Sequence, residues 1–414
     1  MHQHLALPVV FLILLAASCQ RKAQPNDFPT PVDTSTRPID RQVAQAWTFP
    51  NGLKLDNQFP AARLSRVTDQ GDHLAAWTEP ENAPINTSPW YAFRVVAPRD
   101  TTVTVQLNYP AHAVHRYWPK LSTDRTEWTR LDSSALSVDS SARVATLQLQ
   151  LAARKPLYVS AQEIIDSRDV RAWADGLTKN ANVSLGVIGQ SLENRPLLRL
   201  TIKAPGAKKK LPTVVLLSRQ HPPEVTGFLA LQGFLDGLLS DPRLSEFLQS
   251  YQLLIYPLLN PDGVDRGHWR HTAAGIDGNR DWAYYRQPET RQVADDIVAT
   301  TRKRRTSVVL GLDFHSTWKD VYYTHDTSVR PPSVLGDFKG RWLAGIEREI
   351  GGDFRINEEA EPIGKPTTMS WFRTQFGAEG ITYEIGDNTP RDFVERKGRV
   401  SARVMITELL SAAQ

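Results

Sequence analysis

The pattern of apolar and polar positions divides the 414-residue chain into parts with different periodicity. Between residues 47 and 160 the apolar stretches are short and β-branched, as in Tyr91–Ala97 and Thr102–Leu107, and turn residues separate them. Within residues 147–151 leucine alternates with glutamine, which is the period of a half-buried strand. These features predict a small antiparallel β-sandwich domain over residues 47–160.

From residue 161 onward the pattern changes to unbroken apolar runs separated by helical stretches. Four such runs stand out: Thr213–Ser218, Tyr251–Tyr256, Val308–Leu312 and Gly380–Ile385. Unbroken runs of this length are typical of strands buried on both faces of a sheet. The amphipathic stretches between them predict covering helices. We therefore predict an α/β domain over residues 161–414, with a mixed, mainly parallel sheet covered by helices on both faces.

The N-terminus has the sequence pattern of a targeting signal. The apolar run from Leu5 to Ser18 is shorter than the roughly 20 residues that a membrane-spanning helix needs. It ends in small residues directly before Cys19, the only cysteine, and this arrangement predicts a secretory signal over residues 1–19. The junction resembles a bacterial lipobox, which implies that Cys19 is lipidated. The alternative is an ordinary signal peptide with an incidental cysteine.

The segment that follows, residues 20–46, is rich in proline, glutamine, threonine and aspartate and predicts a disordered tether. Together the two segments predict a secreted protein on the periplasmic or cell-surface face, held to the membrane by a lipid anchor. Because Gln20 rather than an aspartate follows Cys19, we expect the outer membrane.

The charge balance gives no indication of a nucleic-acid partner. Lys and Arg number 49 and Asp and Glu 45, so the net charge is only +4. The sequence also lacks a groove-reading or base-stacking motif that would compensate for so small a surplus.

Candidate catalytic residues lie where the predicted strands end. Ligands bind beyond the carboxyl ends of the strands in sheets of this kind. His221 and Glu224 follow the first apolar run, His315 follows the third, and the last run contains Glu384. Two histidines and one carboxylate, with a fourth position left for water, form a known catalytic zinc arrangement. The sequence therefore predicts one Zn²⁺ per chain at His221, Glu224 and His315.

Six motifs in order over residues 165–410 resemble the zinc metallocarboxypeptidases. They are His221-Pro-Pro-Glu224, Asn260-Pro-Asp-Gly263, His268-Trp-Arg270, Gly275-Ile-Asp-Gly-Asn-Arg280, His315-Ser316 and Thr382-Tyr-Glu-Ile385. The layout, with a sandwich before the catalytic domain, is similar to that of the cytosolic-carboxypeptidase branch of the family.

The resemblance implies a role for each remaining site residue. Glu384 is implied as the general acid/base, and Arg270 as the cation that polarises the scissile carbonyl. Asn279 and Arg280 are implied to hold the C-terminal carboxylate of a peptide substrate. Asp277 is implied to accept the outer ring N–H of the first histidine ligand. The implied activity is hydrolysis of a C-terminal peptide bond.

Three functions stay open at this stage. The first is a zinc carboxypeptidase, and the second is a zinc amidase or deacylase acting on peptidoglycan stem peptides. The third is a non-catalytic binding lipoprotein whose sandwich binds a glycan or peptide. Residues 359–369, where digestive members of the family carry a mobile tyrosine, contain none. This stretch therefore leaves open the side-chain specificity, the choice between exo- and endo-action and the identity of any tyrosine acting in the cleft. The sequence also leaves open the role of the sandwich and the oligomeric state.

Overall fold

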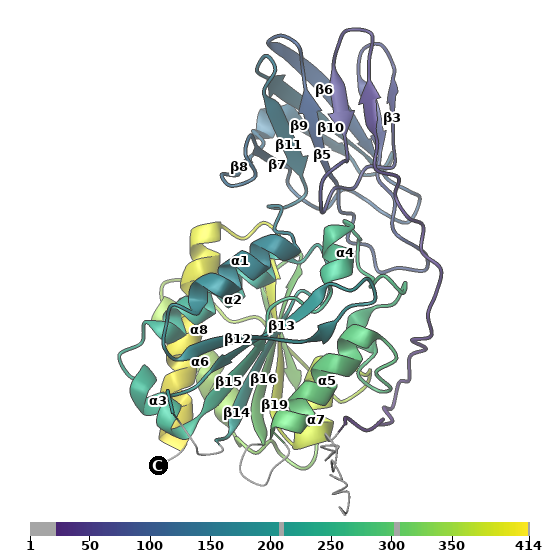
Figure 1. The fold of residues 1–414 in the computed structure, drawn as a ribbon. Helices are drawn as coiled ribbons and strands as arrows, with labels where there is room; N and C mark the ends of the chain where they lie inside the picture. The colour runs from purple at the N-terminus through teal and green to yellow at the C-terminus, as the bar shows by residue number, and fades with distance from the viewer. Residues whose placement is uncertain (1–21, 207–210, 302–306, 413–414) are drawn as a thin grey trace, which may run out of the picture.

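A computed structural model describes residues 22–206, 211–301 and 307–412, so the predicted signal segment and Cys19 lie outside the described residues. Figure 1 shows a β-rich domain stacked on one end of a larger α/β domain. Among the described residues, no helix combines the length and apolarity that a bilayer crossing requires.

The first domain is the predicted sandwich of two sheets. One sheet has the order β1 (Ala46–Thr48), β2 (Lys54–Asp56), β5 (Ala92–Val96), β11 (Pro156–Ser160), β7 (Lys120–Ser122) and β8 (Thr129–Arg130). The other has the order β3 (Arg66–Asp69), β4 (Leu74–Trp77), β6 (Thr101–Asn108), β10 (Val144–Leu151) and β9 (Leu136–Asp139), with the short helix η1 (Ser133–Ala135) before β9. All pairings are antiparallel except β4 with β6, which is parallel.

The alternation read from the sequence explains the sandwich core. In β10 the leucines are buried and the glutamines between them are exposed. Trp269, which belongs to the other domain, is also part of this apolar core. The sandwich core is therefore completed by side chains from the α/β domain, Trp269 and Val225 among them.

The second domain is built on the predicted mixed sheet. The strand order is β12 (Val183–Gln190), β13 (Pro196–Ile202), β15 (Gln252–Tyr256), β14 (Thr213–Ser218), β16 (Val308–Thr317), β19 (Glu379–Gly386), β17 (Val321–His325) and β18 (Glu358–Glu361). Four of the seven pairings are parallel, and they include the central β14–β16 and β16–β19 pairs.

Helices cover both faces of this sheet, as predicted (Figure 1). Val214 and Leu216 of β14 pack in one apolar cluster with α1 (Ser167–Leu177), α2 (Val225–Leu239), α3 (Leu244–Ser250), α6 (Phe338–Ile350) and α8 (Arg391–Ala412). Val215 and Leu217 pack on the other face with α5 (Pro288–Thr301) and α7 (Thr368–Phe376). Successive residues of one strand thus point to opposite faces, which is why the run reads as continuously apolar.

The described part of the N-terminal segment lies along the α/β domain, where the composition predicted a disordered tether. Backbone N–H groups of residues 26, 30 and 37 donate to the carbonyl oxygens of Ala283, Gly364 and Ala274 at 2.9–3.0 Å. Figure 1 shows this segment in purple beside the domain. We call residues 22–40 the N-terminal strap. Composition shows that such a segment cannot form its own core, but not that its backbone finds partners elsewhere.

Candidate active site

Two neighbouring parallel strands bring the predicted metal ligands together. His221 and Glu224 lie in the loop between β14 and α2, and His315 lies near the end of β16. The first turn of α2 passes very close to β16. A Cβ at Gly227 would lie 2.5 Å from the carbonyl oxygen of His315, so this approach requires glycine.

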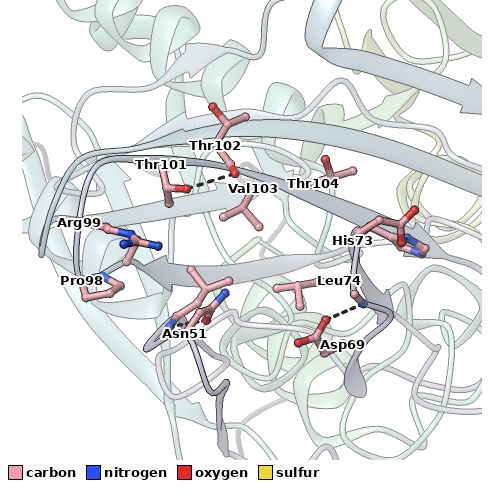
Figure 2. A pocket seen from close by; sticks show the side chains of 14 residues that line it. Asn51, Asp69, His73, Leu74, Pro98, Arg99, Thr101, Thr102, Val103 and Thr104 are labelled. Carbon is pink, nitrogen blue, oxygen red and sulfur yellow. Dashed lines mark hydrogen bonds and ion pairs between the residues drawn. The ribbon is translucent and has the colours of Figure 1, made fainter.

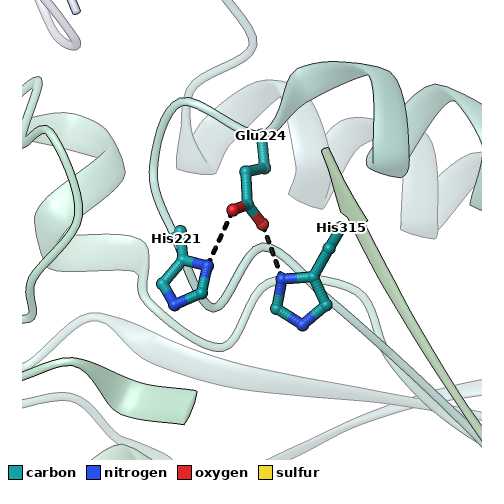
Figure 3. A group of neighbouring side chains, drawn as sticks. All are labelled: His221, Glu224 and His315. Atoms are coloured by element: carbon teal, nitrogen blue, oxygen red, sulfur yellow. Dashed lines mark hydrogen bonds and ion pairs between the residues drawn. The ribbon is translucent and has the colours of Figure 1, made fainter. Parts of the chain in front are cut away.

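The three side chains form one compact buried cluster (Figure 3). Glu224 lies between the two imidazoles, with Oε1 2.8 Å from Nδ1 of His221 and Oε2 2.6 Å from Nδ1 of His315. One ligand atom of each residue lies within 4.8 Å of the other two. The structure therefore brings together all three predicted ligands.

A second carboxylate contacts the outer nitrogen of each histidine. Asp277 Oδ1 lies 2.9 Å from Nε2 of His221, and Asp313 Oδ2 lies 2.7 Å from Nε2 of His315. If each Nε2 donates its proton outward, the Nδ1 lone pairs face the Glu224 oxygens. Lone pairs and a carboxylate repel each other unless positive charge lies between them, and metal-binding histidines usually have such outer partners.

The charges of the cluster lead to the same conclusion. Burial opposes protonation of His315, but the carboxylates of Asp313 and Glu224 outweigh it and raise the pKa of this histidine well above its usual value. Burial would raise the pKa of Glu224, but the two histidines lower it. A donor set of two imidazoles and one carboxylate that attracts positive charge fits Zn²⁺ and leaves a fourth position for water or substrate.

Glu384 lies beside the cluster because its strand pairs with that of His315. The two residues are register partners on the adjacent parallel strands β19 and β16. The Glu384 side chain is half-buried, and its Oε2 has no hydrogen-bond partner among the described residues. Burial and repulsion from Glu224 raise the pKa of Glu384 to about 8. This carboxylate therefore binds a proton more readily than an exposed glutamate does.

One carboxylate connects the metal cluster to the predicted catalytic arginine. Arg270 donates through Nε and Nη2 to Oδ2 of Asp277, at 2.8 Å in each case. The other oxygen of Asp277 contacts His221 and accepts the backbone N–H of Asn279 at 2.9 Å. These bonds hold the guanidinium of Arg270 next to the predicted metal ligands.

Asn279 and Arg280 lie on the short helix η2 (Gly278–Arg280), which follows directly. The Asn279 Oδ1 accepts the backbone N–H of Thr368 at 2.9 Å, which fixes the amide next to His315. Arg280 donates only to a backbone oxygen, that of Asn279 at 2.8 Å, and within the described ranges no carboxylate lies at ion-pair distance from it. Asp281, the residue that could have neutralised it, instead accepts from Thr34 and two backbone N–H groups.

Comparison with known proteins identifies the family. Residues 170–341 match the sequence profile described as zinc carboxypeptidase. The α/β domain belongs to the zinc carboxypeptidase family. Human cytosolic carboxypeptidase 6 is 34% identical over 138 residues, covering 31% of this chain and 27% of that protein. Zebrafish cytosolic carboxypeptidase 2 is 38% identical over 107 residues, covering 25% of this chain and 15% of its own length. The match thus spans about a quarter or less of these relatives.

Solved structures share the fold of both domains. A metallo-carboxypeptidase from Burkholderia cenocepacia superposes with a TM-score of 0.73 over 87% of this chain and 98% of its own, at 19% identity. A metallo-carboxypeptidase from Pseudomonas aeruginosa in complex with (2-guanidinoethylmercapto)succinic acid gives a TM-score of 0.71 over 87% of this chain and 100% of its own, at 18% identity.

Seven of the predicted site residues line one cleft of about 620 Å³ where the two domains meet. The cleft contains the three metal ligands, Arg270, Asn279, Arg280 and Glu384. Its walls include residues that the sequence did not indicate: Thr30 of the strap, Ser88 and Arg116 of the sandwich, and Tyr323 of β17. Arg116 is held by Asp387, with Nε to Oδ2 at 2.7 Å, and by the hydroxyl of Ser88 at 3.0 Å.

Asp313 was also not predicted from the sequence as a partner of His315. Its position two residues before His315 on one strand could have indicated this, because residues i and i+2 of a strand lie on the same face.

Two other histidines near the site lie outside the metal cluster. His268 and His271 flank Arg270, but His268 Nδ1 contacts a backbone oxygen and His271 Nδ1 contacts Asn82.

The sandwich has its own hollow of about 200 Å³ between the β3–β4 and β5–β6 turns, with Asp69 and His73 at its edge (Figure 2). None of the residues lining this hollow lines the cleft.

Proposed function

We propose that the protein is a zinc-dependent carboxypeptidase that hydrolyses the C-terminal peptide bond of peptides with a free carboxylate. The observation that supports this most directly is one cleft with three features: a His-Glu-His set, a carboxylate with a raised pKa, and Arg280, which has no acidic partner among the described residues. The first two serve amide hydrolysis in general. The third favours recognition of a terminal carboxylate.

Each residue has a physical role in this reaction. When bound, zinc supplies a Lewis acid and lowers the pKa of water towards neutrality. The Oε2 atom of Glu384 accepts a proton from the attacking water, and the carboxyl group then gives this proton to the leaving amine. Arg270 stabilises the negative charge that develops on the carbonyl oxygen. Arg280 and the amide of Asn279 hold the substrate carboxylate.

Replacing Arg280 by alanine should weaken hydrolysis of free-carboxylate peptides by roughly 2–5 kcal/mol, or about 30- to 5,000-fold in kcat/KM. The variant loses the charged partner of a desolvated carboxylate. Peptides with amidated C-termini, which present no carboxylate, should be poor substrates of both proteins. The measurement is kcat/KM for one peptide in its free and amidated forms.

Arg286→Ala is the matched control, because this arginine of the same segment pairs with Asp33 at the surface. It should behave as the unmodified protein does. If the unmodified protein cleaves free and amidated peptides equally well, the enzyme is not a C-terminal exopeptidase. That result would favour an endo-acting amidase on peptidoglycan stem peptides.

We also propose that the mature protein is attached to the outer membrane through a lipid on Cys19. The support is the run of small residues before this single cysteine. Cys19→Ser should move the protein from the membrane fraction to the soluble fraction of cells that express it. If the protein stays in the membrane fraction to the same extent, Cys19 does not anchor it, and the N-terminal run is an ordinary signal peptide.

A further inference from the structure

The segment that carries Arg270 is bonded to the sandwich domain. Residues 266–277 form no helix or strand, so the position of Arg270 depends on the bonds that this segment makes. Three consecutive backbone N–H groups donate to one carboxylate, that of Glu81 between β4 and β5. Trp269 donates to Oε2 at 2.7 Å, and Arg270 and His271 donate to Oε1 at 3.0 and 2.5 Å.

Glu81 is a carboxylate in the interior of the protein. Its residue is fully buried, and burying a carboxylate is unfavourable unless it is hydrogen-bonded and paired. Burial alone would raise its pKa, but His268, Arg63 and the N–H of His271 outweigh burial and lower it. Glu81 therefore stays ionised, and charge-assisted hydrogen bonds of this kind are stronger than neutral ones.

Other contacts attach the same segment to the same domain. The ring of Trp269 lies in the sandwich core, and its Nε1 donates to the Trp90 carbonyl oxygen at 3.0 Å. The Asn82 side chain contacts Nδ1 of His271 at 2.6 Å and donates to the Gly275 carbonyl oxygen at 3.0 Å. Both flanks of Arg270 are thus attached to residues of the sandwich domain.

The bond between Arg270 and Asp277 does not replace this attachment. These residues are seven positions apart on the same segment, so their ion pair can move with it. Asp277 links this ion pair to the rest of the site through its contacts with His221 and with the backbone N–H of Asn279 on helix η2. The backbone under Arg270 itself is fixed by Glu81.

We propose that Glu81 is a positioning residue for the carboxypeptidase reaction: through three backbone N–H groups it holds Arg270 where the carbonyl oxygen of the substrate develops charge. This inference rests on the proposed function. It also assigns a task to the sandwich domain, which supplies the support for a catalytic group in the other domain.

Glu81→Gln in the full chain is the first test. The glutamine amide directs an NH₂ group at one of the three donors, so that hydrogen bond is lost and the segment shifts. We expect kcat to fall about 10- to 100-fold while KM changes less than about threefold, because the affected interaction acts mainly in the transition state. Glu79→Gln is the matched control, since Glu79 lies two residues away and is exposed. Its kcat should equal that of the unmodified protein.

A double-mutant cycle separates positioning from general destabilisation. If Glu81 acts through Arg270, the double variant Glu81→Gln/Arg270→Ala should have a kcat less than about threefold below that of Arg270→Ala alone. The zinc content should stay at one per chain throughout. Hydrogen exchange gives a readout without activity: the amides of residues 269–271 should exchange at least about tenfold faster in Glu81→Gln.

Three outcomes would overturn the proposal: a kcat equal to that of Glu79→Gln, fully additive losses in the cycle, or unchanged exchange at residues 269–271. If Glu81→Gln does not fold, Glu81→Asp keeps the charge but shortens the side chain, and the same three readouts apply with smaller expected changes. If the unmodified protein hydrolyses no peptide with zinc present, the proposed function fails, and the exchange measurement still tests whether Glu81 holds the segment.

Discussion

Replacing Glu384 by glutamine is expected to lower kcat by about 10²–10⁴-fold while the fold and the zinc content are retained. The Oε2 atom of Glu384 has no partner among the described residues, and the raised pKa makes the carboxylate a good proton acceptor. The amide of glutamine has nearly the same shape but cannot accept and return a proton. Steady-state kinetics and elemental analysis of the same preparation test both halves of this expectation.

Glu379→Gln is the control for this variant. Glu379 begins the same strand β19 and is buried, but it does not line the cleft. Its replacement should leave most turnover in place. Near-normal turnover by Glu384→Gln, or a comparable loss in Glu379→Gln, would assign the proton transfer to a different group.

Removal of the metal should abolish hydrolysis, and zinc should restore it. Two imidazoles and one carboxylate are ligands that suit zinc, whereas magnesium prefers oxygen ligands and should not restore activity. Zinc should also stabilise the folded protein by about 4 kcal/mol at a concentration 1,000 times its Kd. Activity and thermal unfolding after dialysis against a chelator, with and without added metal, test this expectation.

His315→Ala should lose both responses to zinc, since it removes one of the three ligands. His112→Ala removes an exposed histidine of the sandwich and serves as the control. Full activity after chelation would contradict a catalytic metal. So would equal stabilisation by zinc of His315→Ala and the unmodified protein, because it would place the bound ion elsewhere.

The fold was predictable where the signal is local. The run Thr213–Ser218 is the strand β14 with the same bounds, because burial on both faces leaves a continuous apolar stretch. The strand β18 (Glu358–Glu361) was not predicted, since it lies at the sheet edge and all four of its side chains are exposed. An edge strand of polar residues has no periodicity that distinguishes it from a loop.

The candidate site was predictable where residues follow strands. His221, Glu224 and His315 could be chosen because the carboxyl ends of adjacent parallel strands meet at one edge. Glu81 and Arg116 could not be chosen, since both lie in the other domain and no local pattern indicates their contacts. Glu81 precedes the segment it holds by 188–190 positions, and only the packing of the two domains brings them together.

Residues of both domains line the cleft, and this affects how such proteins can evolve by recombination. All three metal ligands follow residue 220, so an exchange of the first 160 residues with a homologue would transfer none of them. It would, however, replace Ser88 and Arg116 in the cleft wall and Glu81 beneath Arg270. A chimera of this kind should bind zinc normally and still be a poor catalyst. Selection would therefore act on the two domains as one inherited unit.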